Sequence, residues 1–260
     1  MSFVCNITGK KFLLDENEKH RELGSRFGYN CRFRAICFVL TKNLFNEPCI
    51  MLDLPRNKNI KGIGMSDSGW ASICEDKFNY VNTFYHKEPF LDIYNEEHVN
   101  KYQELDFIIS SDVFEHIDTY PDIQIAFNNL NKMLKKNGFI VFSVPFTNGK
   151  HIEHYPLLYD YKILKDNGGE YYLYNKTIDG KKEIHENLCF HGGPGNVLEM
   201  RIFSRDSIKN YLEKAGFTDI IFYKITNEMN NYGIFWSRDN NNDNSLIISA
   251  KKKSTYEPIV

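Results

Sequence analysis

Short apolar segments alternate with amphipathic ones between residues 58 and 145, and this alternation constrains the fold more than any other feature. Segments 105–112 and 139–145 have the length and composition of buried strands, while segment 121–135 has apolar residues at helical spacing and ends at Asn137-Gly138. A chain in which strands and helices alternate builds a parallel sheet with helices on both faces. We therefore predict an α/β fold with a doubly wound, mostly parallel sheet.

Two parts of the chain depart from this alternation. Residues 1–57 are polar and irregular apart from one predicted helix at 31–45. Residues 146–203 contain a predicted β-hairpin, with strands at 171–177 and 181–190. The sequence therefore predicts four parts, which are an N-terminal extension (1–57), a cofactor-binding half (58–145), a substrate-binding insertion (146–203) and a C-terminal part that completes the sheet (204–260).

Composition excludes several classes of function. The formal net charge of −2 gives no basic surface for nucleic acid. No apolar run is long enough to span a membrane, and the first 20 residues lack the apolar stretch of a signal peptide. The six cysteines form no CxxC pair. We expect a cytoplasmic protein that acts on a small molecule, requires no metal and is able to form a homodimer.

Small and polar residues stand at the carboxyl ends of the predicted strands, where open α/β sheets bind their ligands. The small residues of Gly62-Ile-Gly64 let a ligand approach the backbone, although a tight turn that closes helix on strand explains them equally well. Asp67 or Ser68 is also suited to cap the following helix, and Trp70 to pack in the core. The predicted cofactor-binding residues are Gly62, Gly64, Ser66, Asp67, Trp70, Thr83, Asp92, Ser111 and Asp112.

Two longer runs carry a family resemblance. The run DFIISSDVFEHI at 106–117, followed by 128–145 with its LKKNG at 134–138, resembles the fourth-strand and post-helix motifs of class I S-adenosylmethionine-dependent methyltransferases. Segment 201–217 resembles the family's late helix. The resemblance covers about residues 58–250. It implies a seven-stranded Rossmann-like sheet, S-adenosylmethionine as cofactor, S-adenosylhomocysteine as product, and methyl transfer as the reaction.

The N-terminal segment is similar to that of bacterial members of this class with a zinc ribbon. In those proteins CxxCG knuckles precede an NSRxRA helix, and here the corresponding stretches read CNITG at 5–9 and GSRFGYNCRFRA at 24–35. Thr8, Gly24 and Phe27 replace the partner cysteines, so we interpret the segment as a ribbon that has lost its metal. Binding of a metal by Cys5, His20 and Cys31 is the alternative.

Methyl transfer from a sulfonium is an in-line displacement, and a hydroxyl acceptor gains from a general base, for which histidine is suited near pH 7. The candidate catalytic residues are His191, His154 and His116, the last of which follows the predicted fourth strand. Loop histidines without a role are the alternative. The candidate substrate-binding residues are Tyr159, Arg201 and Glu115. Glu115 is also suited to cap the next helix, and Arg201 to form a surface ion pair.

Three functions compete. The first is an O-methyltransferase of a small polar acceptor (a sugar, a nucleotide-sugar or a phosphate-type compound) in bacterial surface-polysaccharide synthesis, meaning capsule or lipopolysaccharide. The second is an NAD-type oxidoreductase, although Gly62-Ile-Gly64 lacks the third glycine of GxGxxG. The third is a catalytically silent protein that binds the cofactor.

Overall fold

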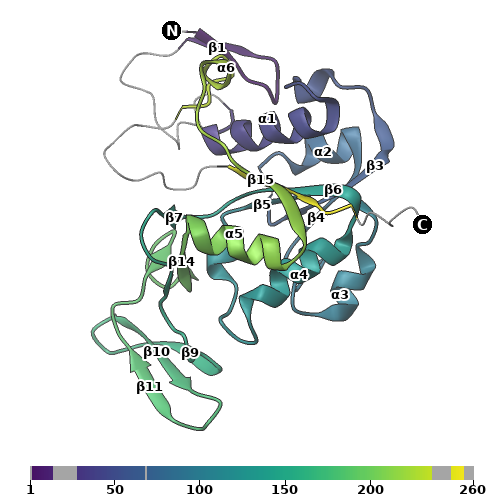
Figure 1. Cartoon of the computed structure of the whole chain (residues 1–260). Coiled ribbons are helices and arrows are strands. Elements are labelled where there is room, and N and C mark those ends of the chain that lie inside the picture. The colour runs from purple at the N-terminus through teal and green to yellow at the C-terminus, as the bar shows by residue number, and fades with distance from the viewer. Residues whose placement is uncertain (1, 14–27, 68, 236–246, 255–260) are drawn as a thin grey trace, which may run out of the picture.

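The computed structural model describes residues 2–13, 28–67, 69–235 and 247–254. Its main sheet has six strands in the order β15-β16-β6-β5-β3-β4 (Figure 1). Strands β6, β5, β3 and β4 run parallel, β16 is antiparallel to its two neighbours β6 and β15, and β15 therefore has the direction of β6. The strands are β3 Asn57–Met65, β4 Phe78–Thr83, β5 Leu105–Ser111, β6 Leu134–Ser143, β15 Phe217–Phe222 and β16 Ile248–Lys252. The predicted doubly wound, mostly parallel α/β sheet is confirmed.

The strand count differs from the seven that the family resemblance implied. Beside β4, the chain makes one parallel bridge, Phe84 with Phe90, where a further strand would lie. The amide of Phe84 donates to the Pro89 carbonyl (2.8 Å), and that of Leu91 donates to the Phe84 carbonyl (2.9 Å). The ladder stays this short because Pro89 has no N–H and because Asp92 already begins a turn.

Helices cover both faces of the sheet (Figure 1). Helices α1 (Cys31–Phe45) and α2 (Ala71–Lys77) share one apolar cluster with Phe107 and Ile109 of β5. Ile108, between them in sequence, belongs to the cluster on the other face, as expected from the alternation of side chains along a strand. That face carries α3 Glu96–Lys101, α4 Ile123–Met133 and α5 Arg205–Lys214.

Two helix boundaries differ from the sequence predictions. Helix α4 ends at Met133, because β6 already begins at Leu134, so Asn137-Gly138 lies inside a strand where the register with β5 shifts. A Cβ at Gly138 would press against the backbone carbonyl of Leu105, so this glycine permits the close approach of β5. Helix α2 has no side-chain cap, and the alternative cap Ser68 lies outside the described residues.

The N-terminal part packs on the α1 side of the sheet. It contains strands β1 Ser2–Val4 and β2 Lys11–Leu13 and the 3-10 helix η3 Met51–Asp53, and α6 Asn227–Asn230 lies beside it (Figure 1). Cys5 and Cys31 are buried in the cluster of α1. His20, Gly24 and Phe27, named above for a metal ribbon, lie outside the described residues.

The insertion after β6 builds small sheets of its own. The predicted hairpin is confirmed as β10 Tyr171–Lys176 paired with β11 Lys182–His185, and β9 Asp160–Lys165 joins it as a third strand. This lobe projects away from the main sheet (Figure 1). The other short strands are β7 Phe146–Thr147, β8 Ile152–Glu153, β12 Phe190–His191, β13 Val197–Leu198 and β14 Arg201–Ser204, and the 3-10 helix η4 is Phe114–His116. Across the described ranges, we find no helix with the length and hydropathy to cross a membrane.

Candidate active site

The carboxyl ends of β3 and β4 are tied together by hydrogen bonds. Ser66, in the left-handed region with φ 59°, donates its amide to the Thr83 carbonyl at 2.8 Å. The Thr83 hydroxyl donates to the Gly64 carbonyl (2.9 Å), and the Asp67 amide donates to Oδ1 of Asn82 (2.9 Å). The structure therefore uses the predicted cofactor residue Thr83, and the unpredicted Asn82, to shape the turn after β3.

Asp67, which follows β3, has a buried carboxyl group. One of its oxygens accepts a hydrogen bond from the indole Nε1 of Trp70, and the other has no hydrogen-bond partner among the described residues. Burial raises the pKa of Asp67 to about 7, although the Trp70 hydrogen bond and the charge of Arg32 act in the opposite direction. This carboxyl therefore titrates near neutral pH, and it does not cap α2.

Asp112 follows β5, and residues from three elements hold it. Its amide donates to the Ser143 carbonyl (2.9 Å), the Ser143 hydroxyl donates to Oδ1 (2.6 Å), and Arg32 from α1 forms an ion pair with Oδ2. The hydroxyls of Ser110 and Ser111 are buried beside it and find no hydrogen-bond partner within the described ranges. Polar atoms that a ligand can satisfy thus collect at the end of β5.

The remaining predicted cofactor residues have other roles. A Cβ at Gly62 would overlap the Phe107 ring, and one at Gly64 would overlap the Tyr80 hydroxyl, so these glycines serve packing. Trp70 is fully buried in the cluster under α1. Asp92 accepts the Tyr94 amide at 2.9 Å and so forms a local turn.

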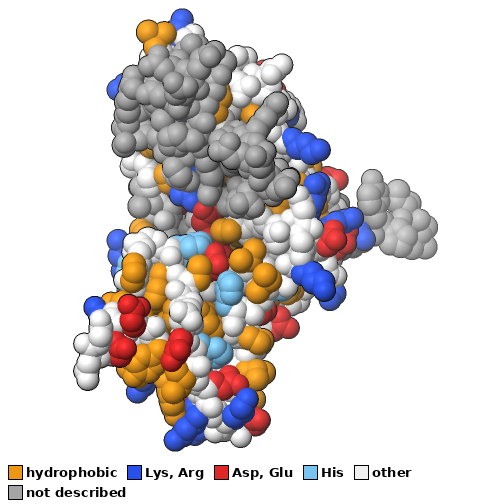
Figure 2. Space-filling model, turned by 90° about the vertical axis from the view of Figure 1, so that its left-hand side faces the viewer, with side chains coloured by type: hydrophobic (Ala, Val, Ile, Leu, Met, Phe, Trp, Pro, Cys, Tyr) orange, Lys and Arg blue, Asp and Glu red, His pale blue; other side chains and the backbone are white. Residues whose placement is uncertain are grey.

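The three candidate catalytic histidines, predicted from separate segments, lie together with Glu115 and Glu199. His116 belongs to η4 and His191 to β12, and their rings meet edge to face with centroids 4.7 Å apart. His154 follows β8 and reaches the same cluster through Glu199. On the face shown in Figure 2, histidine and acidic side chains lie near one another in the middle of the molecule, among hydrophobic ones.

Glu199 connects two of these histidines, and the sequence predictions did not include it as a site residue. Its Oε1 lies 3.1 Å from Nε2 of His154, and its Oε2 lies 2.6 Å from Nε2 of His191. A carboxylate accepts hydrogen bonds, so both histidines present a ring N–H to it. Glu199 therefore orients the two rings.

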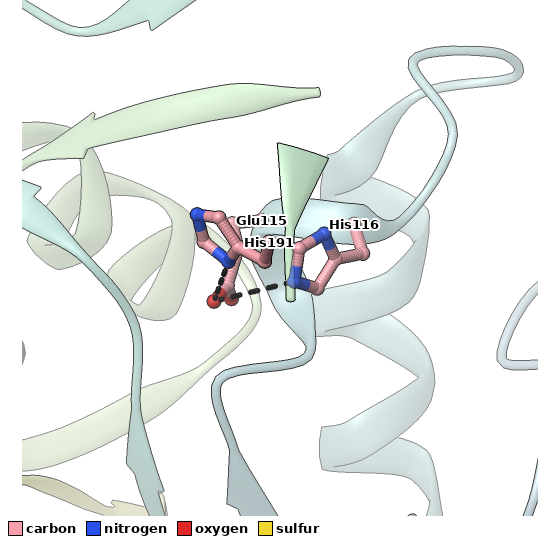
Figure 3. Close-up of side chains that lie close together, drawn as sticks. All are labelled: Glu115, His116 and His191. Atoms are coloured by element: carbon pink, nitrogen blue, oxygen red, sulfur yellow. Dashed lines mark ion pairs between the residues drawn. The ribbon is translucent and has the colours of Figure 1, made fainter. Parts of the chain in front are cut away.

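Glu115 lies at the bottom of the cluster and is fully buried (Figure 3). Its Oε1 is 3.7 Å from Nε2 of His116 and 3.8 Å from Nδ1 of His191. Burial raises the pKa of this carboxyl well above its usual range, and the charge of Asp112 acts in the same direction. Burial also lowers the pKa of His116. The helix-cap alternative for Glu115 is wrong, because Asp122 caps α4.

Arg201 donates to backbone carbonyls on either side of Glu115 and His116. It is fully buried, and its guanidinium donates to Oε1 of Glu153 (2.7 Å) and to the carbonyls of Phe114 (2.8 Å) and Ile117 (2.6 Å). It therefore fixes η4, and it is no surface pair. Tyr159 is 48% exposed, and its ring stands edge-on to that of Tyr120 with centroids 4.9 Å apart.

One protein family and several solved structures are similar to this chain. Residues 11–220 match a family model described as a methyltransferase domain. The chain resembles the structure of an S-adenosylmethionine-dependent methyltransferase from Clostridium acetobutylicum at 14% identity and a TM-score of 0.47, covering 85% of this chain and 92% of that one. It also resembles the 1,6-didemethyltoxoflavin-N1-methyltransferase of Burkholderia thailandensis at 11% identity and a TM-score of 0.48, covering 85% and 78%.

No curated protein sequence matches the chain. The matching family model describes a methyltransferase domain and not the NAD-type oxidoreductase of the alternative. The family model alone spans most of the sequence, from before α1 to within β15. The chain therefore belongs to the methyltransferase domain family and is a methyltransferase.

Proposed function

We propose that this methyltransferase uses S-adenosylmethionine to methylate a hydroxyl group of a small polar acceptor. The observation that carries the proposal is the histidine–glutamate cluster directly after β5. It sets groups able to take a proton beside the strand ends, the edge at which open α/β sheets bind ligands.

The polar atoms at the strand ends fit the predicted cofactor. Ser110, Ser111 and Asp67 each present a buried oxygen without a hydrogen-bond partner in the described part of the chain. Such oxygens suit the hydroxyl and amino groups of an adenosine, and Asp112 lies next to them. When bound, S-adenosylmethionine supplies a methyl group on a sulfonium. The chain's own task is to bind, to orient and to exclude water.

His191 is the best-placed base for the acceptor hydroxyl. Its Nε2 faces Glu199, so the neutral ring keeps the Nδ1 lone pair for accepting a proton. The Glu199 carboxylate would then stabilise the imidazolium that forms. His154 shares the same carboxylate and is the second candidate. His116 donates its Nδ1 hydrogen to the Leu198 carbonyl (2.8 Å), and burial disfavours its charged form.

The insertion supports a small, polar acceptor. Its β9–β11 lobe is rich in tyrosine, and Tyr161 donates a hydrogen bond to Asp118 at 2.9 Å. Tyrosine rings with polar tips suit a sugar, a nucleotide-sugar or a phosphate-type compound. We place the reaction in cytoplasmic steps of bacterial capsule or lipopolysaccharide synthesis. The four-part division with residues 146–203 as the substrate-binding part, a contact of Tyr159 with the acceptor, and a homodimer belong to the same proposal.

Binding and turnover test this function separately. Isothermal titration should detect binding of S-adenosylmethionine and of S-adenosylhomocysteine, and absence of both would overturn the cofactor assignment. With hydroxyl acceptors screened by methyl transfer, His191→Ala should lower kcat by about 10² to 10⁴. The matched control is His98→Ala in α3, whose ring lies outside the cluster and outside the insertion. Equal turnover of the two variants would remove His191 as the base.

A further inference from the structure

We propose that Glu115, His116 and His191 form a binding site for one divalent transition-metal cation of the Zn²⁺ type. A ligand oxygen of Glu115 and one ring nitrogen of each histidine all lie within 4.8 Å of one another (Figure 3). The inference goes beyond the proposed function, because it depends neither on the cofactor nor on the acceptor. A cation bound to Nδ1 of His191 takes the lone pair proposed above for the base, so in the metal-loaded protein His154 is the remaining candidate base.

The hydrogen bond of Nδ1 in His116 determines that the other ring nitrogen, Nε2, has the lone pair. Nδ1 lies 2.8 Å from the Leu198 carbonyl oxygen, which can only accept a hydrogen bond, so Nδ1 carries the hydrogen. The neutral ring therefore presents the lone pair of Nε2, which lies 3.7 Å from Oε1 of Glu115. A hydrogen bond from the second ring nitrogen to a backbone carbonyl is the usual support of a metal-ligating histidine.

His191 is oriented in the complementary way. Its Nε2 lies 2.6 Å from Oε2 of Glu199, so the carboxylate takes the hydrogen of that nitrogen. The lone pair of Nδ1 then lies 3.8 Å from the same Oε1 of Glu115. Glu199 is itself held by His154, at 3.1 Å. The second histidine thus has the carboxylate–histidine support that is typical of metal sites.

Glu115 supplies the negative charge of the site. Its side chain is fully buried, and neither oxygen has a hydrogen-bond partner among the described residues. Its backbone is fixed as well, because the Met200 amide donates to the Glu115 carbonyl at 2.8 Å. The two unpartnered oxygens of Glu115 face two nitrogen lone pairs, and one cation between them would satisfy all three side chains.

The donor set selects the kind of cation. Two imidazoles and one carboxylate suit zinc and neighbouring transition metals, whereas Mg²⁺ and Ca²⁺ prefer oxygen ligands alone. Tetrahedral zinc bonds of about 2.1 Å set ligand atoms roughly 3.4 Å apart. The separations of 3.7 and 3.8 Å to Glu115 are slightly wider, so small side-chain rotations complete the site. Three protein ligands leave the fourth position for water or an acceptor oxygen.

Metal titration of the tag-free, chelator-treated full chain tests the site without cofactor or acceptor. We expect isothermal titration with ZnCl₂ to give one site per chain, and CoCl₂ to produce the visible absorption of a tetrahedral Co²⁺ complex. Glu115→Gln and His191→Asn should each lower the affinity more than tenfold, and Glu199→Gln by about 10- to 100-fold. His185→Asn, which changes a histidine–glutamate pair outside the cluster, should leave the affinity unchanged.

Three results would overturn the site: no binding of Zn²⁺ or Co²⁺, the same affinity in wild type and His191→Asn, or an equal loss of affinity in His185→Asn. Circular dichroism checks that each variant folds. If Glu115→Gln does not fold, His191→Asn decides, because the His191 side chain is 36% exposed and the buried Glu199 keeps its contact with His154. The methyltransferase proposal is judged by cofactor binding and turnover, so either proposal can fail alone.

Discussion

Replacing Asp67 with asparagine should change how the stability of the protein depends on pH. The carboxyl is 2% exposed, and its pKa is raised from 3.8 to about 7 in the folded state. A group whose pKa is raised by folding binds its proton more tightly in the folded state. Its contribution to stability is therefore complete below pH 4 and is lost as the pH rises through about 7.

The size of the effect follows from the shift. About three pKa units correspond to about 4 kcal/mol between pH 3 and pH 8, and to about 1.4 kcal/mol per pH unit between pH 5 and pH 7. Asparagine has no such titration, while its carbonyl can still accept the hydrogen bond of the Trp70 indole. The variant should therefore gain about 2 to 3 kcal/mol relative to wild type between pH 5 and pH 8.

Urea unfolding followed by circular dichroism at pH 5, 6, 7 and 8 measures this difference. The control is Asp76→Asn, whose exposed carboxyl has its pKa lowered below 3.8 by a hydrogen bond from Arg56, so that its stability difference from wild type should be the same at pH 5 and pH 8. A stability difference between wild type and Asp67→Asn that is the same at pH 5 and pH 8 would refute the reasoning.

Two further predictions concern packing. Arg201→Ala should lower the free energy of unfolding by about 3 to 5 kcal/mol, because two backbone carbonyls lose their side-chain donor and Glu153 keeps only His151. A loss below about 1 kcal/mol in urea unfolding would contradict this. Gly62→Ala should lower stability by about 1 to 3 kcal/mol, because the added Cβ overlaps the Phe107 ring. In thermal unfolding, Phe107→Leu should partly relieve the effect of Gly62→Ala, and strictly additive losses would show that the ring is not the obstacle.

Much of the sheet was predictable because its signals are local. The apolar run at 105–112 and the first strand of the hairpin appear in the structure within one residue of the predicted bounds, while the second strand, predicted at 181–190, already ends at His185. One prediction failed because a glycine is required by close packing against a residue that is distant in the sequence. Asn137-Gly138 is typical of a helix end, yet Gly138 lies in β6 and leaves room for the Leu105 carbonyl, over 30 residues away in sequence. Gly62 and Gly64 also lie against aromatic side chains, of β5 and β4, which local spacing does not reveal, and their contact with the cofactor stays a prediction.

The site was predictable in its residue types and not in its pairings. A histidine after the fourth strand and histidines in the insertion are visible as candidates, and the structure brings His116, His154 and His191 together. Glu199 gives no comparable signal, because its partner His154 is 45 residues away. Arg32 reaches Asp112 from a helix that lies before the sheet in the sequence. Such pairs depend on tertiary contacts that no local spacing encodes.

The buried Arg201 connects the two parts of the chain that supply the site, namely η4 and the insertion. It belongs to β14 of the insertion, yet it donates to the carbonyls of Phe114 and Ile117, which flank Glu115 and His116 on η4. The neighbouring Met200 amide holds the Glu115 carbonyl, and the Met200 carbonyl accepts the His154 amide at 2.9 Å. Met200 and Arg201 of the insertion thus position Glu115 and His116 on η4 as well as His154. Because η4 follows β5 with only Asp112 and Val113 between them, Glu115 and His116 stay beside the carboxyl end of β5, while His154 and His191 come from the insertion.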